Sequence, residues 1–177
     1  EAPNGSPDVI FIATGSEVQL AVEARAVLSA EGINARVVSA PSLEWFEEQD
    51  AAYRESVLPA AVRARVSIEA GLGLTWRSYV GDTGRSVSIE HYGASADYKT
   101  LFTQFGITTD AAVAAAKETL AANGVDLLSV PVVDVKKGPR CAHCGKRGAE
   151  EHHWAPRAIF GQDVADAWPT DFLCKAC

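Results

Sequence analysis

Residues 9–16 decide the fold, and they read Val9-Ile10-Phe11-Ile12-Ala13-Thr14-Gly15-Ser16. The first five are all apolar, as expected of a parallel strand that is buried on both faces of a sheet. Thr14 and Gly15 then predict a tight turn, and Ser16 is placed to cap a helix from Glu17 to about Glu31. A buried strand followed at once by a helix predicts an α/β layer.

Apolar side chains recur at helical spacing in this first helix, and the next glycine in the chain, Gly32, is expected to end it. They are Val18, Ala21, Ala24, Val27 and Leu28.

The same alternation of strand and helix patterns continues as far as Gly124. It predicts an α/β domain with a mostly parallel sheet and flanking helices. The expected strands are 35–40, 64–70 and 86–89, and the expected helices are 47–57, 75–80, 98–105 and about 108–124, the last with Ala112, Val113, Ala116 and Leu120 on one face.

The composition is that of a soluble globular protein, with 47% hydrophobic and 22% charged residues. The first residues are polar and do not resemble a signal peptide. No apolar run approaches the roughly 20 residues that span a bilayer. We therefore expect a cytoplasmic location and no membrane partner.

The charge is unevenly distributed along the chain, whose net charge is −7. Residues 135–177 are mildly basic, so the acidic excess lies before them. This contrast predicts two units: an α/β domain at 1–124 and a small module at 138–177, joined by a linker at 125–137. The acidic first unit argues against nucleic-acid binding there, whereas weak nucleic-acid binding by the tail stays an alternative.

Three stretches of the first unit resemble one enzyme family. They are DVIFIATGSEVQLAV at 8–22, ARVSIEA at 64–70, and IEHYGASADY at 89–98 followed by FTQFGIT at 102–108. In this order and without large gaps, they resemble the C-terminal domain of transketolase, of the type found in high-GC bacteria. The resemblance covers roughly residues 6–124.

This resemblance implies a limited function for the chain. In the family, thiamine diphosphate and its divalent metal are bound by two preceding domains, which these 177 residues do not contain. The chain is therefore expected to be the non-catalytic C-terminal portion of a transketolase-like protein. It would support ketol transfer, a reaction of the pentose phosphate pathway, only together with those domains. The expected partners are the catalytic transketolase domains or a second copy in a homodimer.

Three features of the first unit invite a site interpretation. Gly15-Ser16 could bind an anion at a helix N-terminus, but a tight turn with a helix cap explains it better. His91 is best interpreted as a surface or interface histidine, since no carboxylate or nucleophile is fixed beside it by the sequence. The turn at 81–84 superficially resembles the family's GDG motif but lacks the acid and asparagine ligands that follow it.

All four cysteines of the chain lie near its end, in a CxxC…CxxC arrangement. Each CxxC pair can present two thiolates to one ion, and two such pairs complete a tetrahedral site. Because cysteines elsewhere are absent, we expect metal rather than disulfides, and zinc before iron. The predicted structural zinc ligands are Cys141, Cys144, Cys174 and Cys177.

The tail as a whole resembles the zinc-stabilised HNH family, which has a treble-clef fold. The match consists of the first CxxC, the stretch His152-His153-Trp154-Ala155-Pro156, and a final LCxxC. By this resemblance His152 would hold a nuclease metal and His153 would be the general base. The family's histidine after the last cysteine and its asparagine before LCxxC have no counterpart here. An HNH-type nuclease or nucleic-acid-binding module is therefore the alternative to a structural zinc tail.

Overall fold

The computed structural model describes residues 5–127, which all belong to one compact unit. It confirms the predicted parallel sheet, whose strand order is β2-β1-β3-β4 with every neighbouring pair parallel. The strands of the sheet are β1 (Val9–Ala13), β2 (Ala35–Ser39), β3 (Arg65–Ile68) and β4 (Arg85–Val87).

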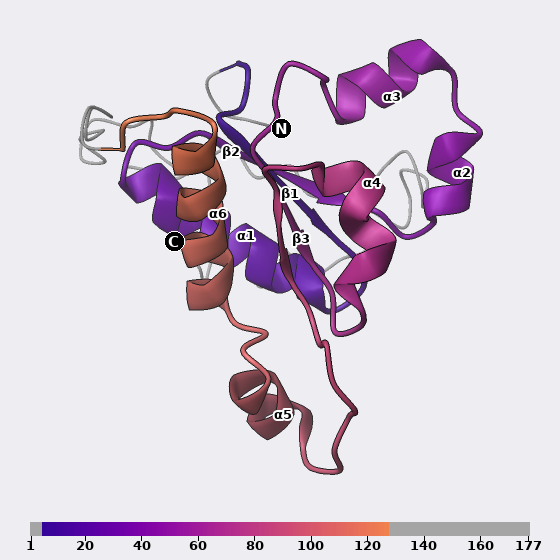
Figure 1. The fold of residues 1–177 in the computed structure, drawn as a ribbon, viewed down its shortest axis with the longest axis vertical. Coiled ribbons are helices and arrows are strands. Elements are labelled where there is room, and N and C mark those ends of the chain that lie inside the picture. The colour runs from indigo at the N-terminus through magenta and orange to yellow at the C-terminus, as the bar shows by residue number, and fades with distance from the viewer. Residues whose placement is uncertain (1–4, 128–177) are drawn as a thin grey trace, which may run out of the picture. The chain divides into compact units, whose positions relative to one another are not determined.

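Helices flank this sheet on both faces (Figure 1). One face is covered by α1 (Glu17–Ala30) and α6 (Thr109–Ala122). The other face is covered by the segments around α2 (Leu43–Glu47), α3 (Ala51–Val57), the 3-10 turn η1 (Gly73–Trp76) and α4 (Arg77–Val80). The remaining helix, α5 (Tyr98–Gln104), lies away from the sheet.

Strand β1 is buried on both faces, as its apolar run predicts. Val9, Phe11 and Ala13 belong to the cluster that includes α1 and α6 residues. Ile10 and Ile12 belong to the opposite cluster, with Trp76 and Val80. Because successive side chains of a strand point to opposite faces, this one strand joins two cores. Each large apolar side chain so buried contributes about 1.5–3 kcal/mol.

Helices α1, α5 and α6 end in the same way, each with a glycine in the left-handed conformation just past the last turn. In α5 the Gly106 amide donates to the Thr103 carbonyl at 3.3 Å, and the Ile107 amide donates to the Phe102 carbonyl at 2.8 Å. This pair of bonds is a Schellman motif, and Gly32 and Gly124 close α1 and α6 with equivalent pairs. The glycine stops expected from the sequence are confirmed.

Two expectations about helix beginnings were wrong. The helix predicted at 47–57 begins only at Ala51, where Asp50 accepts a hydrogen bond from the Tyr53 amide. A separate helix, α2, precedes it and was not predicted; Ser42 caps it by accepting a hydrogen bond from the Trp45 amide. Ser16 does not cap α1 with its side chain, because its backbone is already helical, at φ −68° and ψ −24°.

Other boundaries differ by a few residues. The helix predicted at 75–80 begins as the 3-10 turn and becomes α-helical only from Arg77. The strand expected at 86–89 is shorter, but pairing continues past its end, since the Ile89 amide donates to the Gly71 carbonyl at 2.8 Å. Pairing also continues past the end of β2 in the strand expected at 35–40, because the Ala40 amide donates a hydrogen bond to the Ala13 carbonyl at 2.9 Å.

No helix in the described range 5–127 is long and apolar enough to cross a membrane. The predicted module at 138–177 and most of the predicted linker at 125–137 lie outside the described residues. The same holds for the four cysteines at 141, 144, 174 and 177 and for His152 and His153.

Candidate functional site

The carboxyl ends of β1 and β3 mark the position at which α/β folds usually bind ligands. From β1 the chain first moves outward to β2 and then crosses back to β3, so the strand order reverses between β1 and β3. At this switch point the Thr14 hydroxyl donates a hydrogen bond of 2.5 Å to the Glu69 carboxylate. The two side chains that follow the adjacent strands are therefore bonded to each other across the crevice.

The turn at Gly15-Ser16, considered above as an anion site, is poorly suited to one. The Glu17 amide donates to the Thr14 carbonyl at 3.1 Å, which makes the tight turn expected from the sequence. The Ser16 hydroxyl lies 3.1 Å from the buried Glu17 carboxylate and donates to it. With Glu17 in the first turn and Glu69 across the crevice, an anion would meet negative charge rather than free amides.

Glu90 connects the end of β4 to the turn before α4. Its carboxylate accepts a hydrogen bond from the Ser88 hydroxyl at 2.7 Å and one from the Gly73 amide at 2.9 Å. These bonds lower the pKa of Glu90 below its ordinary value; the Ser88 bond has the larger effect and the Gly73 bond the smaller. A side chain at Gly73 would approach this carboxylate and the Ser88 hydroxyl to 2.8 Å. The chain therefore leaves β4 in a direction that is fixed by contacts.

Residues 88–105, which we call the arm, project away from the sheet after β4 (Figure 1). The arm consists of an extended segment followed by α5. His91 lies on its surface, with its ring edge-on to Phe105 at 4.7 Å between centroids. Its Nδ1 atom lies 2.8 Å from the Tyr92 carbonyl oxygen. His91 is thus exposed among the described residues, in agreement with its interpretation as a surface or interface histidine.

The end of the arm is anchored to the core. Asp97 caps α5 by accepting hydrogen bonds from the Lys99 and Thr100 amides, both at 3.1 Å, and from the Thr100 hydroxyl at 2.6 Å. The Thr100 bonds hold the pKa of Asp97 below its ordinary value. Phe102 and Phe105 pack against the core cluster beneath α1 and α6. Specific contacts therefore hold the arm in place at both of its ends.

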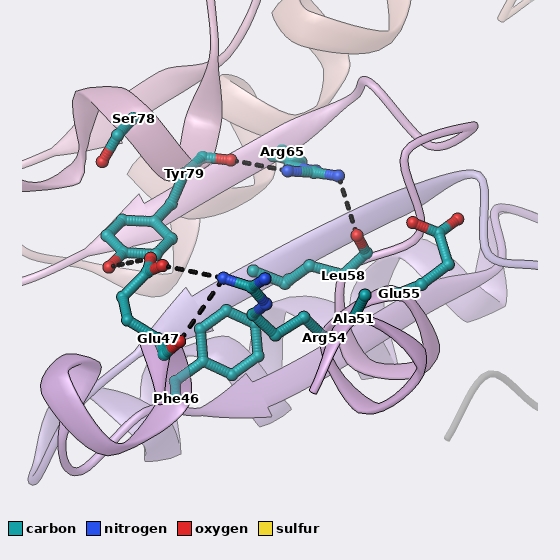
Figure 2. Close-up of a pocket in the computed structure, with 9 residues that line it drawn as sticks. All are labelled: Phe46, Glu47, Ala51, Arg54, Glu55, Leu58, Arg65, Ser78 and Tyr79. Carbon is teal, nitrogen blue, oxygen red and sulfur yellow. Dashed lines mark hydrogen bonds and ion pairs between the residues drawn. The ribbon is translucent and has the colours of Figure 1, made fainter. Parts of the chain in front are cut away.

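A shallow pocket of about 310 Å³ lies at the amino-terminal side of β3 (Figure 2). The Glu47 carboxylate accepts a hydrogen bond of 2.8 Å from the Tyr79 hydroxyl and pairs with Arg54 at 3.3 Å. The pKa of Tyr79 is raised to about 12, mainly by burial. The hydrogen bond to Glu47 and the charges of Glu47 and Glu44 add to this shift. The lining residues are Phe46, Glu47, Ala51, Arg54, Glu55, Leu58, Arg65, Ser78 and Tyr79.

Arg65 in this pocket has a structural role, because it binds backbone carbonyls of neighbouring segments. It donates four hydrogen bonds of 2.8 to 3.1 Å to the backbone carbonyls of Leu58, Pro59, Val62 and Tyr79. Burial lowers the pKa of Arg65, although the charge of Glu55 opposes the shift. Since its donors are bound to carbonyls, the guanidinium joins the loop after α3 to α4 rather than facing an anion.

The turn at 81–84 does not fit the pyrophosphate or the divalent metal of thiamine diphosphate. Its Asp82 carboxylate pairs with Arg63 at 2.7 Å, and the Thr83 carbonyl accepts the Thr119 hydroxyl at 2.8 Å. One Asp82 oxygen and the Thr83 carbonyl are thus already bonded within the domain, whereas a divalent metal needs several converging oxygens. Within residues 5–127 no group of three or more histidine, cysteine, aspartate or glutamate side chains could hold a metal ion.

The sequence interpretation missed the roles of Thr14, Glu69 and Glu90. A signal for them was present, since Thr14 and Glu90 directly follow predicted strands and Glu69 lies near the end of the strand predicted at 64–70, and the carboxyl ends of parallel strands meet at one edge of the sheet. The projection of the arm had no local signal, because it depends on how the core holds the two ends of that segment.

A parallel sheet with helices packed on both faces defines an α/β domain. The comparisons with known proteins show the family of this domain. Residues 1–108 match the family described as transketolase-like TK C-terminal domain. The chain belongs to this family.

Relatives support the same assignment. Transketolase of Mycobacterium tuberculosis is 59% identical over 118 residues, which are 67% of this chain and 17% of the relative. Transketolase 1 of Escherichia coli is 58% identical over 116 residues, 66% of this chain and 18% of the relative. The solved transketolase of Leishmania mexicana superposes with a TM-score of 0.63 at 37% identity, covering 68% of this chain and 17% of that one. The chain thus spans less than a fifth of the length of these relatives.

Proposed function

We propose that residues 5–127 act as the C-terminal domain of a transketolase-like enzyme and support ketol transfer only together with catalytic domains. The observation that carries this proposal is the match of about two thirds of the chain to less than a fifth of each relative, at 58–59% identity. The described residues support it further, because Thr14 and Glu69 are bonded to each other at the switch point and Glu47 in the pocket is bonded to Tyr79 and Arg54.

The test is a ketol-transfer assay with thiamine diphosphate and Mg²⁺. We expect no turnover by the full 177-residue chain alone. Added to Mycobacterium tuberculosis transketolase that lacks its own matching C-terminal segment, the chain should bind and raise the activity or the melting temperature. Turnover by the chain alone, or no effect on the truncated enzyme, would contradict the proposal.

For the tail we propose a structural zinc site formed by Cys141, Cys144, Cys174 and Cys177, on the strength of their CxxC…CxxC spacing. Elemental analysis of the full chain should give one zinc per chain, and Cys174→Ser should lose it. Chelation should change the tryptophan fluorescence of the tail, because metal binding supplies much of the folding energy of so small a module. A zinc-free chain with four titratable thiols would disprove the site.

The alternative for the tail, an HNH-type nuclease, rests on the adjacent His152 and His153. A plasmid-nicking assay with Mg²⁺, Mn²⁺ or Ni²⁺ tests it on the same preparation. Activity that is lost in His153→Ala would favour the nuclease, whereas activity that His153→Ala retains would come from a contaminant.

A further inference from the structure

We propose that the arm, together with Leu72 and Leu74 beside its base, is the surface by which this domain binds the catalytic portion of a transketolase. The inference rests on the proposed function and adds to it the surface that makes the contact. It follows from the shape of the arm, its exposed side chains and its unpaired backbone.

The arm keeps its form without being covered by the rest of the described chain. Its start is fixed by Glu90, its helix is capped by Asp97, and its end is closed by the Schellman motif at Gly106. Residues 91–100 between these anchors are all exposed. A projecting segment that is held in shape at both ends is pre-organised, which lowers the entropic cost of binding a partner.

Exposed apolar side chains gather on this part of the molecule. Tyr92 is 97% exposed, and Tyr98 is also exposed at the first turn of α5. Leu72 and Leu74 flank Gly73, whose amide is bonded to Glu90 at the base of the arm. These four residues are half of the eight large hydrophobic side chains exposed in the described range. Aromatic side chains of this kind commonly carry the binding energy of protein interfaces.

The backbone of the extended segment is also available to a partner. Among the described residues, no backbone-to-backbone hydrogen bond joins 90–96 to any other part of the chain. At Gly93 a Cβ atom would meet nothing within 4 Å, so another chain can approach the backbone closely there. Exposed peptide groups beside tyrosines suit a protein surface better than a small molecule, which needs a concave site.

The catalytic portion of a transketolase is the occupant that the comparisons favour. The family match extends over residues 1–108 and so includes the whole arm. In the relatives the matched region is continuous with more than four fifths of further chain. A domain that is part of a larger enzyme must present at least one surface to the remainder, and the arm is the described segment best shaped for this contact.

The test measures binding of the full 177-residue chain to the Mycobacterium tuberculosis transketolase that lacks its matching C-terminal segment. We expect Tyr92→Ser combined with Leu74→Ser to raise the Kd by about tenfold or more, because truncating central interface side chains has effects of this size. Trp45→Ser is the matched control: Trp45 is 73% exposed on α2, away from the arm, and its loss should leave the Kd within about twofold. Circular dichroism melts verify that the variants fold.

The outcomes separate the two proposals. If the wild-type chain does not bind the truncated enzyme, the proposed function fails and the arm inference fails with it. If the wild-type chain binds and the arm variant binds equally well, the inference alone is overturned. If sedimentation shows that the arm variant abolishes self-association instead, the occupant is a second copy and the inference is again wrong.

A chimera provides a second measurement that does not depend on the truncated enzyme. In it, residues 1–127 replace the matching segment of the Mycobacterium tuberculosis transketolase. The arm variant should lower the melting temperature of the chimera and leave that of the 177-residue chain unchanged, while Trp45→Ser should change neither. Equal effects of the two variants on the chimera would contradict the inference.

Discussion

The hydroxyl of Thr14 donates a hydrogen bond of 2.5 Å to the carboxylate of Glu69, 55 residues further along the chain. The bond joins the ends of two neighbouring parallel strands at the point where the strand order reverses. In many α/β proteins a ligand occupies this crevice. Here the side chains of Thr14 and Glu69 are bonded to each other at this position.

We expect Thr14→Val to lower the free energy of unfolding by about 1–2 kcal/mol, because a half-buried hydrogen bond to a charged acceptor is lost without a change of shape. Thr14→Ser keeps the hydroxyl and should cost less. Urea denaturation of the full chain measures both variants. A double-mutant cycle with Glu69→Gln should show coupling, and purely additive effects would mean that the bond contributes nothing.

A second prediction concerns two residues that precede the long helices. Thr108 caps α6 by accepting a hydrogen bond from the Ala111 amide at 3.2 Å, whereas Ser16 makes no such bond to α1. Thr108→Ala should therefore destabilise the domain by about 1 kcal/mol, while Ser16→Ala should cost less than about 0.5 kcal/mol. Urea denaturation of both variants measures these changes in the free energy of unfolding. Equal losses in the two variants would contradict the observed capping.

Much of the sheet was predictable because its signals are local. The apolar run of β1 and the glycines after α1, α5 and α6 each carry their own physical reason. The helix α2 and the late start of α3 were not predicted, although Ser42 and Asp50 are both good capping residues. The predicted helix began at Glu47 instead, within the polar stretch 47–50 at the junction of the two helices.

The candidate site was less predictable than the fold. Thr14 and Glu69 are brought together only by the pairing of β1 with β3, and sequence alone does not specify which strands are neighbours. The direction of the arm likewise depends on the bond between Glu90 and the Gly73 amide, which joins residues 17 positions apart. Contacts that arise from tertiary structure leave no periodic pattern in the chain.

The burial pattern of α1 leads to a third prediction. Leu28 is fully buried, whereas Val27, assigned to the same apolar face from the sequence, is 42% exposed. Leu28→Ala should cost about 2–5 kcal/mol, since it removes core contacts and leaves a cavity. Val27→Ala should change the free energy of unfolding by no more than about 0.5 kcal/mol. Comparable losses would mean that α1 is rotated relative to the sheet.

The lowered pKa of Glu90 predicts a pH dependence at the base of the arm. A carboxylate whose pKa is depressed on folding contributes stability above its unfolded pKa and loses it as the pH falls through the folded value. The stability difference between the wild-type chain and Glu90→Gln should therefore be largest at neutral pH and shrink below the ordinary glutamate pKa of 4.5. Urea denaturation across this range measures it, and a difference that is constant with pH would contradict the role of the charge.

Tyr79 gives the opposite pH dependence. Its pKa is raised from 10.0 to about 12, mainly by burial and also by its hydrogen bond to Glu47. Because the folded pKa is the higher one, its contribution to stability is complete below the unfolded value and is lost as the pH rises through the folded value. Titration by phenolate absorbance should show a late component that Tyr79→Phe removes and that Glu47→Gln shifts partly back toward 10.0. In the control Tyr92→Phe, which removes a fully exposed phenol, the late component should persist. A late component that survives in Tyr79→Phe would assign the raised pKa to another tyrosine.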